Sequence, residues 1–545
     1  MRYLVQISIG PVQSFIAASR KTRDLAVGSR VLGKIAESVA AYLESAGAGL
    51  IFPGSSSSPA ANVLLFTFEG DAGDICAGAR KVAEACLQEL VQDAASRAGR
   101  LVDSAIDLKE HSSKFLEWFA AWVPIEGGGH AGYASARRRV GGLMASRKAF
   151  RDFGSAPAEP RHGGFGRPKS PFDPGYCGVL KLGDGWKVSR GSDIRVKERE
   201  HLDAIGLVKR FGQLSVDKNR FSSTRKIAIS SELQKDLGLM EKLEDLWKGL
   251  SPEERSEFDI GDFVFGDTEE LPEHIRENLR AAMSGSKVRK RPYYAILHAD
   301  GDSMGVVLDK VAEKLGEEGH REVSRLLGEF ATHVGKLVTK HHGELVYAGG
   351  DDVLALAPLD VSVTLAKEIR ELFVRTLGDW AAKEVGMSPS LTMGVAAVHI
   401  NENLQAAVEF SRELERLGKT LVINGSAKNS IVIGAKPRGG GPIYCAGHWD
   451  EGICEDFDAA MNALDSKNGS IPRGLPYELR TLSEELENVG SDKHFPGLVA
   501  SEVQRVFKKK EVSSSYVVPP VESVEDLSRY SQVLMVAHFF TREGL

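Results

Sequence analysis

The sequence predicts an α+β fold built on two related sheets. The opening residues alternate between apolar and polar side chains like a strand, and a second strand pattern starts at residue 293. Each start leads into the order helix, strand, strand, helix, which is typical of helices packed on one face of a mostly antiparallel sheet. When "YLVQISIG" (3–10) is set against "YAILHADG" (294–301), the glycines coincide and Ile9 takes the place of Asp300. A chance match over so short a stretch is the alternative.

The elements of the first half follow from their residue patterns. Helical periodicity predicts a helix over 28–47, ended by Gly47, and another over 77–96. Between these helices, "LIF" (50–52) and "NVLLFTF" (62–68) are predicted strands, separated by a turn-rich segment.

The second half repeats this order after a change of character. Gly, Pro, Arg and Ser cluster between 154 and 175, and charged helical stretches such as 232–250 follow, which indicates an inserted and largely helical domain. We then expect a long helix over 313–342, a hairpin over 344–358 and a strand over 390–400. The predicted domains are a first, non-catalytic sheet domain (1–130), the inserted domain (131–285), a catalytic sheet domain (286–436) and a C-terminal helical domain (437–545).

Composition limits the classes of protein to consider. The 545 residues are 42% hydrophobic and 26% charged, and no apolar run approaches the ~18 residues that span a bilayer. The N-terminus has no signal-peptide pattern, so we expect a cytoplasmic protein without membrane contact. The net charge of -6 gives no global attraction to nucleic acid, and local basic segments leave such contacts open. These segments are 136–153, 161–169, 286–291 and 507–510.

Cysteine usage does not predict a disulfide framework or a zinc site. Five cysteines are too few and too scattered for disulfides in a chain of this length, so we expect free thiols. The nearest approach to a metal knuckle contains Cys445, His448 and Cys454, and it lacks a fourth ligand nearby.

Acidic residues gather at two predicted strand ends. Asp300 and Asp302 end one strand, and Asp351 and Asp352 lie at the tip of "ELVYAGGDDVLALAP" (344–358). Gly and Asp are also ordinary turn residues, so a turn without further function is the simplest reading of the tip. If the hairpin lies beside the strand that carries Asp300 and Asp302, three or four carboxylates lie close together. Such a cluster needs a cation, because like charges repel. Hard oxygen ligands in an open site suit two Mg²⁺ or Mn²⁺ ions, as nucleotidyl transfer requires.

Several neighbouring residues are candidates for contact with nucleotide. Glycines at the hairpin tip would let backbone N–H groups approach a base or phosphate. Lys428, just ahead of a predicted strand, is a candidate phosphate ligand, although a loop lysine is more often a solvated charge. The predicted nucleotide-binding residues are Gly301, Ser303, Gly305, Gly349, Gly350, Lys428 and Asn429, and the predicted catalytic residues are Asp300, Asp351 and Asp352.

Five motifs together carry a family resemblance. They are "IGPVQSFIAASRKTRDLAVGSRVL" (9–32), "EREHLDAIGLVKRF" (198–211), "FSSTRKIA" (221–228), "YYAILHADGDSMG" (293–305) and "YAGGDDVLAL" (347–356). In this order they resemble the large polymerase/cyclase-like subunit of type III CRISPR effector complexes, most closely the Cmr type.

The resemblance implies a fold, an activity and partners. It implies two ferredoxin-like palm domains, an inserted small domain and a C-terminal helical domain. The implied activity makes cyclic oligoadenylates from ATP when a complex of further subunits and guide RNA captures target RNA. The family's metal-binding aspartates fall on Asp300, with Asp302 nearby, and on Asp351 and Asp352. Lys428 and Asn429 resemble the family's phosphate-contacting element.

The sequence departs from the family pattern in two places. Many members begin with an HD nuclease domain, whereas the palm motif here begins at residue 3, so DNase activity is not expected from this chain. Many members bind zinc through four cysteines of the inserted domain, where Cys177 stands alone here.

Two other functions remain open, a nucleotide-binding scaffold without turnover and a stand-alone cyclic dinucleotide synthase. The Gly-Gly-Asp-Asp tip argues mildly against the synthase.

Overall fold

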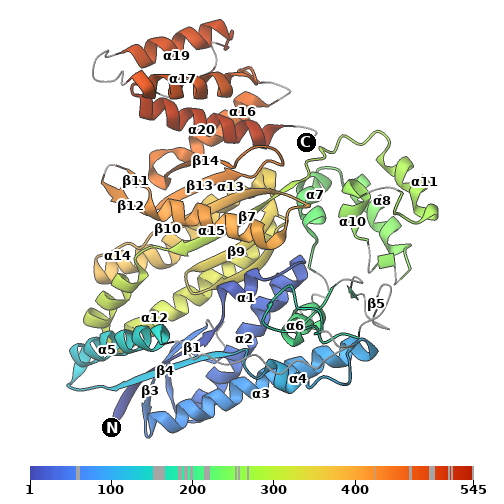
Figure 1. The fold of residues 1–545 in the computed structure, drawn as a ribbon. Helices are drawn as coiled ribbons and strands as arrows, with labels where there is room; N and C mark the ends of the chain where they lie inside the picture. The colour runs from blue at the N-terminus through green and yellow to red at the C-terminus, as the bar shows by residue number, and fades with distance from the viewer. Residues whose placement is uncertain are drawn as a thin grey trace.

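The computed structural model contains two β-sheets with helices packed against them, an inserted helical group and a C-terminal helical group (Figure 1). The described residues run from 1 to 542, without 57–61, 151–165, 182–186, 189–193, 197–199, 214–220, 252–253, 256–257, 267–268, 424, 466–468, 490–496, 514–515 and 517–519. Parts of the basic segments 136–153 and 161–169 therefore lie outside the described residues. Within the described part, no helix is both long and apolar enough to cross a membrane.

The N-terminal sheet has four antiparallel strands in the order β2-β3-β1-β4. The strands are β1 (Arg2–Gly10), β2 (Gly49–Phe52), β3 (Val63–Glu69) and β4 (Glu117–Pro124), and the helical elements among them are α1 (Gln13–Ala17), α2 (Thr22–Ser45), α3 (Ala72–Ala98), η1 (Gly99–Leu101) and α4 (Leu108–Ser112). Alternation along β1 places Val5, Ile7 and Ile9 in the core formed with α2 and α3, whereas Leu4 belongs to a core on the other face. That second face is covered by α5 (Gly129–Ala149).

The second sheet has six strands in the order β14-β13-β10-β7-β9-β8. They are β7 (Tyr293–Gly301), β8 (Glu344–Gly349), β9 (Asp352–Pro358), β10 (Leu391–His399), β13 (Ser430–Ala435) and β14 (Ile443–His448). Only the β10–β13 pair is parallel, and α15 (Leu404–Thr420) makes the crossover between these two strands. A separate small ribbon consists of β11 (Val422–Ile423) and β12 (Ser426–Ala427).

The two sheets share one connectivity. The first strand of each lies between the third and the fourth, giving β4-β1-β3-β2 in one sheet and β10-β7-β9-β8 in the other. With a helical segment after the first and third strands, this is the ferredoxin-like β-α-β-β-α-β unit. Strands β1 and β7 both span nine residues and end at Gly10 and Gly301, so Ile9 and Asp300 hold equivalent positions. The predicted α+β fold with two related palm-like domains is thus confirmed.

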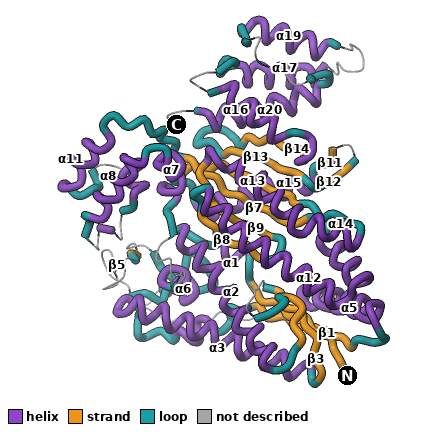
Figure 2. The backbone as a smooth tube through the Cα atoms, turned by 180° about the vertical axis from the view of Figure 1, so that it is seen from behind, coloured by secondary structure: helices purple, strands orange, loops and turns teal. Residues whose placement is uncertain are grey.

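Different helices cover the two faces of the second sheet (Figure 2). One face packs against α12 (Met304–Lys340), η2 (Leu359–Val361), α13 (Ser362–Phe373), the π-helical turn η3 (Val374–Gly378) and α14 (Asp379–Val385). The other face carries the side chains of Tyr294 and Ile296 and packs against α15 and the N-terminal domain. Because residues two apart on a strand share a face, His298 and Asp300 belong to this α15 face.

The region between the sheets is largely helical. It contains α6 (Ala204–Phe211), α7 (Thr224–Gln234), α8 (Leu237–Lys248), α10 (Ile260–Phe265), α11 (Glu273–Met283) and the short strands β5 (Lys187–Val188) and β6 (Arg195–Val196). Residues of α7, α8, α10 and α11 form a small core of their own, whereas α6 packs on α2 and α3.

The C-terminal region adds one strand before it becomes helical. Strand β14 lies within 437–545 yet pairs antiparallel with β13, because the glycines of 439–441 allow the chain to return along that strand. The elements that follow are η4 (Trp449–Glu451), α16 (Ile453–Leu464), α17 (Leu475–Val489), α19 (Leu498–Lys509) and α20 (Val524–Thr541). Their apolar side chains continue the core of the second sheet.

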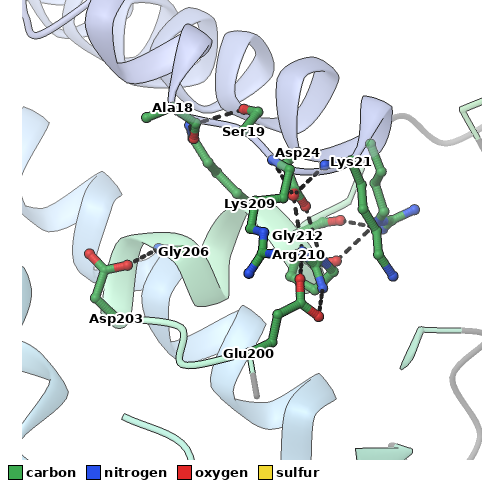
Figure 3. Close-up of polar contacts among 12 residues, drawn as sticks. Ala18, Ser19, Lys21, Asp24, Glu200, Asp203, Gly206, Lys209, Arg210 and Gly212 are labelled. Carbon is green, nitrogen blue, oxygen red and sulfur yellow. Dashed lines mark hydrogen bonds and ion pairs between the residues drawn. The ribbon is translucent and has the colours of Figure 1, made fainter. Parts of the chain in front are cut away.

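A buried ion-pair network joins two of the quoted motifs (Figure 3). The Arg210 guanidinium of α6 donates to both Asp24 carboxylate oxygens, at 2.8 and 3.0 Å, and to both Glu200 oxygens, at 2.8 and 2.9 Å. Burial alone would raise the pKa of Asp24, but the Arg210 charge and hydrogen bonds hold it below its ordinary value. The Lys209 ammonium donates to the Phe15 and Ala18 carbonyls, so α6 is fixed to α1 and α2.

Candidate active site

The first strand of the second sheet and the predicted hairpin meet at the two central aspartates. Ala299 of β7 pairs with Val353 of β9, and the next residues outward are Asp300 and Asp352. Both belong to the face covered by α15, because each lies two residues from a side chain of that face. Gly350 takes a φ of 66°, which favours glycine at the hairpin tip. Burial of the two apolar strands therefore fixes the acidic tip beside the end of β7.

Asp351 lies on the opposite side of β7 from Asp300. A Cβ atom added to Gly301 would stand 2.6 Å from Asp351 Oδ2, so only glycine lets this carboxylate approach the β7 backbone. Burial, and then the negative charge of Asp302, raises the pKa of Asp351. Gly301, between Asp300 and Asp302, is thus the residue that lets Asp351 approach β7.

Asp302 is held by hydrogen bonds inside the protein. It is 2% exposed, and its carboxylate accepts from Ser390 Oγ at 2.8 Å and from Thr392 Oγ1 at 2.9 Å. The backbone N–H of Asn429 also donates to Asp302 Oδ2, at 2.9 Å. Asp302 therefore ties the end of β7 to β10 and to the loop before β13, and its oxygens are already engaged within the protein.

Three non-glycine residues near these aspartates have left-handed backbone conformations. They are Ser303 with φ 58°, Lys428 with φ 71° and Asn429 with φ 49°. The Lys428 ammonium donates to Ser303 Oγ at 3.1 Å, so the two strained segments touch. Such conformations persist where the surroundings impose them, and they cluster at functional sites. Lys428 and Asn429 thus lie beside the acidic residues, and their contact with phosphate stays a prediction.

The predicted glycines differ in their surroundings. Gly305 lies in the first turn of α12 and has open space around its Cβ position. Gly350 is also open, with Phe52 as its nearest neighbour at 3.9 Å. At Gly349 a Cβ would collide with the ring of Tyr347, so this glycine serves the packing of the hairpin itself.

Sequence reasoning missed the charged residues that α15 brings to the site. The Lys419 ammonium pairs with Asp300 and also lies 3.1 Å from Glu415 Oε1. Arg412 Nη2 donates to the carbonyl of Gln13 at 2.9 Å, which connects α15 to α1 of the N-terminal domain. Arg412, Glu415 and Lys419 recur at helical spacing in line with the buried Val408. The sequence signal that could have identified these residues is the presence of charged side chains on the apolar stripe of the amphipathic helix α15.

The electrostatics of the site fit a hard cation. Burial, the Asp351 charge and the Glu415 charge raise the pKa of Asp352 to about 7. Burial also raises the pKa of Glu415 to about 7. Such a group of carboxyls ionises readily only beside positive charge, and an all-oxygen donor set suits Mg²⁺ or Mn²⁺. In the described parts of the chain, no three His, Cys, Asp or Glu side chains are already arranged around a common metal position.

The cysteines lie away from this site. Cys445 of β14 and Cys454 of α16 are buried free thiols in the core shared by the second sheet and the C-terminal helices. Burial raises the pKa of Cys454 to about 12. Cys177 is also a buried free thiol, and its Sγ lies 3.9 Å from His111 Nε2.

Comparison with protein-family models identifies both sheet domains. Residues 4–112 match the N-terminal domain of the CRISPR-associated protein Cmr2, and residues 293–432 match the second palm domain of Cas10/Cmr2. Both sheet domains are thus similar to domains of Cas10/Cmr2 proteins. The second match contains the predicted aspartates, the hairpin, Lys428 and Asn429, so the candidate site lies in the part of the chain that is similar to the Cas10/Cmr2 palm domain.

Individual relatives agree with this assignment. The Cmr subunit Cmr2 of Pyrococcus furiosus is 29% identical over 220 residues, which cover 34% of this chain and only 24% of that protein. The structure of a type III-B Cmr-beta complex bound to cognate target RNA contains a similar chain, with a TM-score of 0.70 and 13% identity. That match covers 99% of this chain and 83% of the other. A Csm1–Csm4 cassette in complex with one ATP gives a TM-score of 0.53 at 12% identity, covering 99% and 70%. These structures therefore contain chains with the same fold as this chain.

Proposed function

We propose that this chain is a subunit of a type III CRISPR effector complex and converts ATP into cyclic oligoadenylates when the complex has bound target RNA. The observation that carries the proposal is the placement of Asp300 and Asp352 side by side on one face of the palm sheet, with Asp351 at the adjoining tip. Related folds have been solved with target RNA, with ATP and with pppApA, which supports nucleotide and RNA as the ligand classes.

The reaction is the attack of a 3′-hydroxyl on the α-phosphorus of ATP, which forms a phosphodiester bond and releases pyrophosphate. Asp300, Asp351 and Asp352 would hold two Mg²⁺ or Mn²⁺ ions. When bound, these ions supply activation of the hydroxyl and neutralise charge on the leaving group. The Lys428 ammonium offers positive charge to the triphosphate beside Ser303. Asp302 keeps the Asn429 backbone, and with it Lys428, at this position.

The proposed partners are the other subunits of the effector complex, a guide RNA and a target RNA. The contact of Arg412 with the Gln13 carbonyl joins the palm site to the N-terminal domain. A change of the N-terminal domain on assembly would therefore reach α15, the helix that carries Lys419 and Glu415.

Mass analysis of the products of the reconstituted complex tests the proposal. The complex is incubated with ATP and Mg²⁺ or Mn²⁺, with and without complementary RNA. We expect cyclic adenylates only with complementary RNA, and their loss in an Asp351→Ala, Asp352→Ala double variant. Asp245→Ala, on the exposed surface of α8, is a control that should retain synthesis.

One observation favours a second candidate, a scaffold that binds nucleotide without turnover. Asp300 is already paired with Lys419, and Asp302 is fully engaged within the protein. ATP binding by the assembled complex without any product, with either metal ion, would support the scaffold and contradict the synthase. Product formation from GTP by the isolated chain would instead support a stand-alone cyclic dinucleotide synthase.

A further inference from the structure

A lysine already pairs with Asp300, one of the three residues proposed to hold the metal ions. Lys419 lies in the last turn of α15, and its ammonium contacts carboxylate oxygens of both Asp300 and Glu415. The Lys419 and Asp300 side chains are each 30% exposed, whereas the Glu415 side chain is 8% exposed. One ammonium thus bridges an open acid at the end of β7 and a buried acid on its own helix.

We propose that Lys419 is a resident counter-ion of Asp300 that a divalent cation must displace, and that Glu415 then keeps the released ammonium at the site. This inference rests on the metal site of the proposed function. It assigns to Lys419 and Glu415 the role of positioning residues that set how readily the site accepts a metal ion.

The competition follows from simple electrostatics. The Asp300 carboxylate carries a single negative charge, and the Lys419 ammonium that lies against its Oδ2 repels a dication approaching the same carboxylate. When the Lys419 ammonium leaves Asp300, it keeps a counter-charge on its own helix. Glu415 is four residues earlier, and its Oε1 lies 3.1 Å from the Lys419 Nζ. The buried Glu415 Oε1 accepts no hydrogen bond from the described residues, so the ion pair with Lys419 is what compensates its charge.

The other charges around the pair do not replace this arrangement. Lys428 bonds to the Ser303 hydroxyl and not to a carboxylate. Arg412 points to the Gln13 carbonyl and to Glu409, and Arg416 pairs with Glu409. Lys419 is therefore the cation in contact with Asp300 among the described ion pairs of this site.

The proposed displacement has a consequence for metal loading. Free Mg²⁺ or Mn²⁺ must break the Lys419 ion pair with only water to complete its coordination. A metal ion that arrives with ATP brings phosphate oxygens and a larger favourable interaction. The site should therefore discriminate against metal without nucleotide, and removal of the lysine charge should weaken that discrimination.

Titration of Mn²⁺ into the full-length chain without nucleotide, followed by electron paramagnetic resonance of the free ion, tests the proposal. Lys419→Met should bind Mn²⁺ about three- to fivefold more tightly than the unaltered chain, the size expected for loss of one partly exposed ion pair. Lys419→Arg keeps the charge and should bind as the unaltered chain does. Circular dichroism checks that each variant is folded.

Two further variants separate displacement from a general effect of charge. Arg416→Met removes a nearby cation on the same helix that pairs with Glu409 and not with Asp300, and at moderate salt it should change Mn²⁺ affinity less than twofold. In an Asp300→Asn background, Lys419→Met should no longer tighten binding, because the contested oxygen has lost its charge.

The outcomes distinguish the inference from the proposed function. Equal Mn²⁺ affinity with and without Lys419, or equal tightening in the Asp300→Asn background, overturns the counter-ion role and leaves the metal site standing. Absence of Mn²⁺ binding from every form overturns the metal site itself, and with it both the inference and the proposed reaction.

Discussion

Asp352 shows how a single buried carboxyl connects the site to the stability of the chain. Its pKa of about 7 results from burial, the Asp351 charge and the Glu415 charge, whereas an aspartate in an unfolded chain ionises near ~4. Between these two values the folded chain binds more protons at Asp352 than the unfolded chain does. Stability contributed at this position therefore falls as pH rises through this range.

Asp352→Asn should consequently stabilise the metal-free chain at high pH. We expect a gain in the free energy of unfolding on the order of 1–2 kcal/mol at pH 8. Little gain is expected at pH 4, where the folded state is protonated and the unfolded state is about half protonated. Urea unfolding with a chelator at the two pH values measures the difference. Asp360→Asn is the control, because Asp360 pairs with Lys235 and should gain nothing. A variant less stable than the unaltered chain at pH 8 would contradict the raised pKa.

At the scale of elements, α6 owes its position to ionic hydrogen bonds as well as to apolar packing. Arg210 lies between Asp24 of α2 and Glu200, and all three are buried. The network links two motifs that are far apart in the sequence. The motif at 9–32 supplies Asp24, and the motif at 198–211 supplies Glu200 and Arg210. Removing Arg210 alone would leave the Asp24 and Glu200 carboxylates buried without a compensating charge.

Arg210→Met should cost about 3–5 kcal/mol of stability at neutral pH, as for other broken buried ion pairs. Arg325→Met, which removes two exposed ion pairs within α12, should cost no more than ~1 kcal/mol. Chemical denaturation of both variants gives the comparison. Lowering the pH toward 4 should narrow the Arg210→Met deficit, because protonation discharges the stranded carboxyls. In the unaltered chain, the Asp24 contribution is instead lost only as pH falls through its depressed pKa. Similar costs for the two variants would contradict the structural role of the network.

At the scale of the whole molecule, the two palm-like sheets have the same connectivity and different uses. Ile9 is 1% exposed and packs in the core between β1, α2 and α3, whereas Asp300 at the equivalent position is partly exposed beside Lys419. The end of β1 is part of the hydrophobic core, whereas the end of β7 carries the candidate site.

Exchanging the residue types at these positions should therefore have unequal effects. Ile9→Asp buries a charge without a partner and should destabilise the chain by on the order of 3–5 kcal/mol. Asp300→Ile removes a partly exposed ion pair and should change stability by no more than ~1 kcal/mol, while weakening Mn²⁺ binding. Urea unfolding of both variants, with Mn²⁺ titration of the second, tests the asymmetry. A large loss of stability in Asp300→Ile would show that this position is structural too.

Local patterns predicted the framework of the fold well. Alternation and helical periodicity placed the strand at 293–301, the hairpin at 344–358 and the repeated order of elements, because burial of one face imposes these periods on the sequence itself. The strand β14 was missed, since its place in the sheet depends on pairing with β13 and not on its own pattern.

By itself, the sequence determined two palm-like units and an acidic tip at Asp351 and Asp352 beside the end of the strand that carries Asp300. Only the tertiary structure decided what each acid contacts. Thr392 and Asn429 reach Asp302, Lys419 reaches Asp300, and Arg210 reaches Asp24. These partners are far apart along the chain, and periodicity reports only which face of an element is buried. Which charges meet on that face is set by how the sheets and helices pack together.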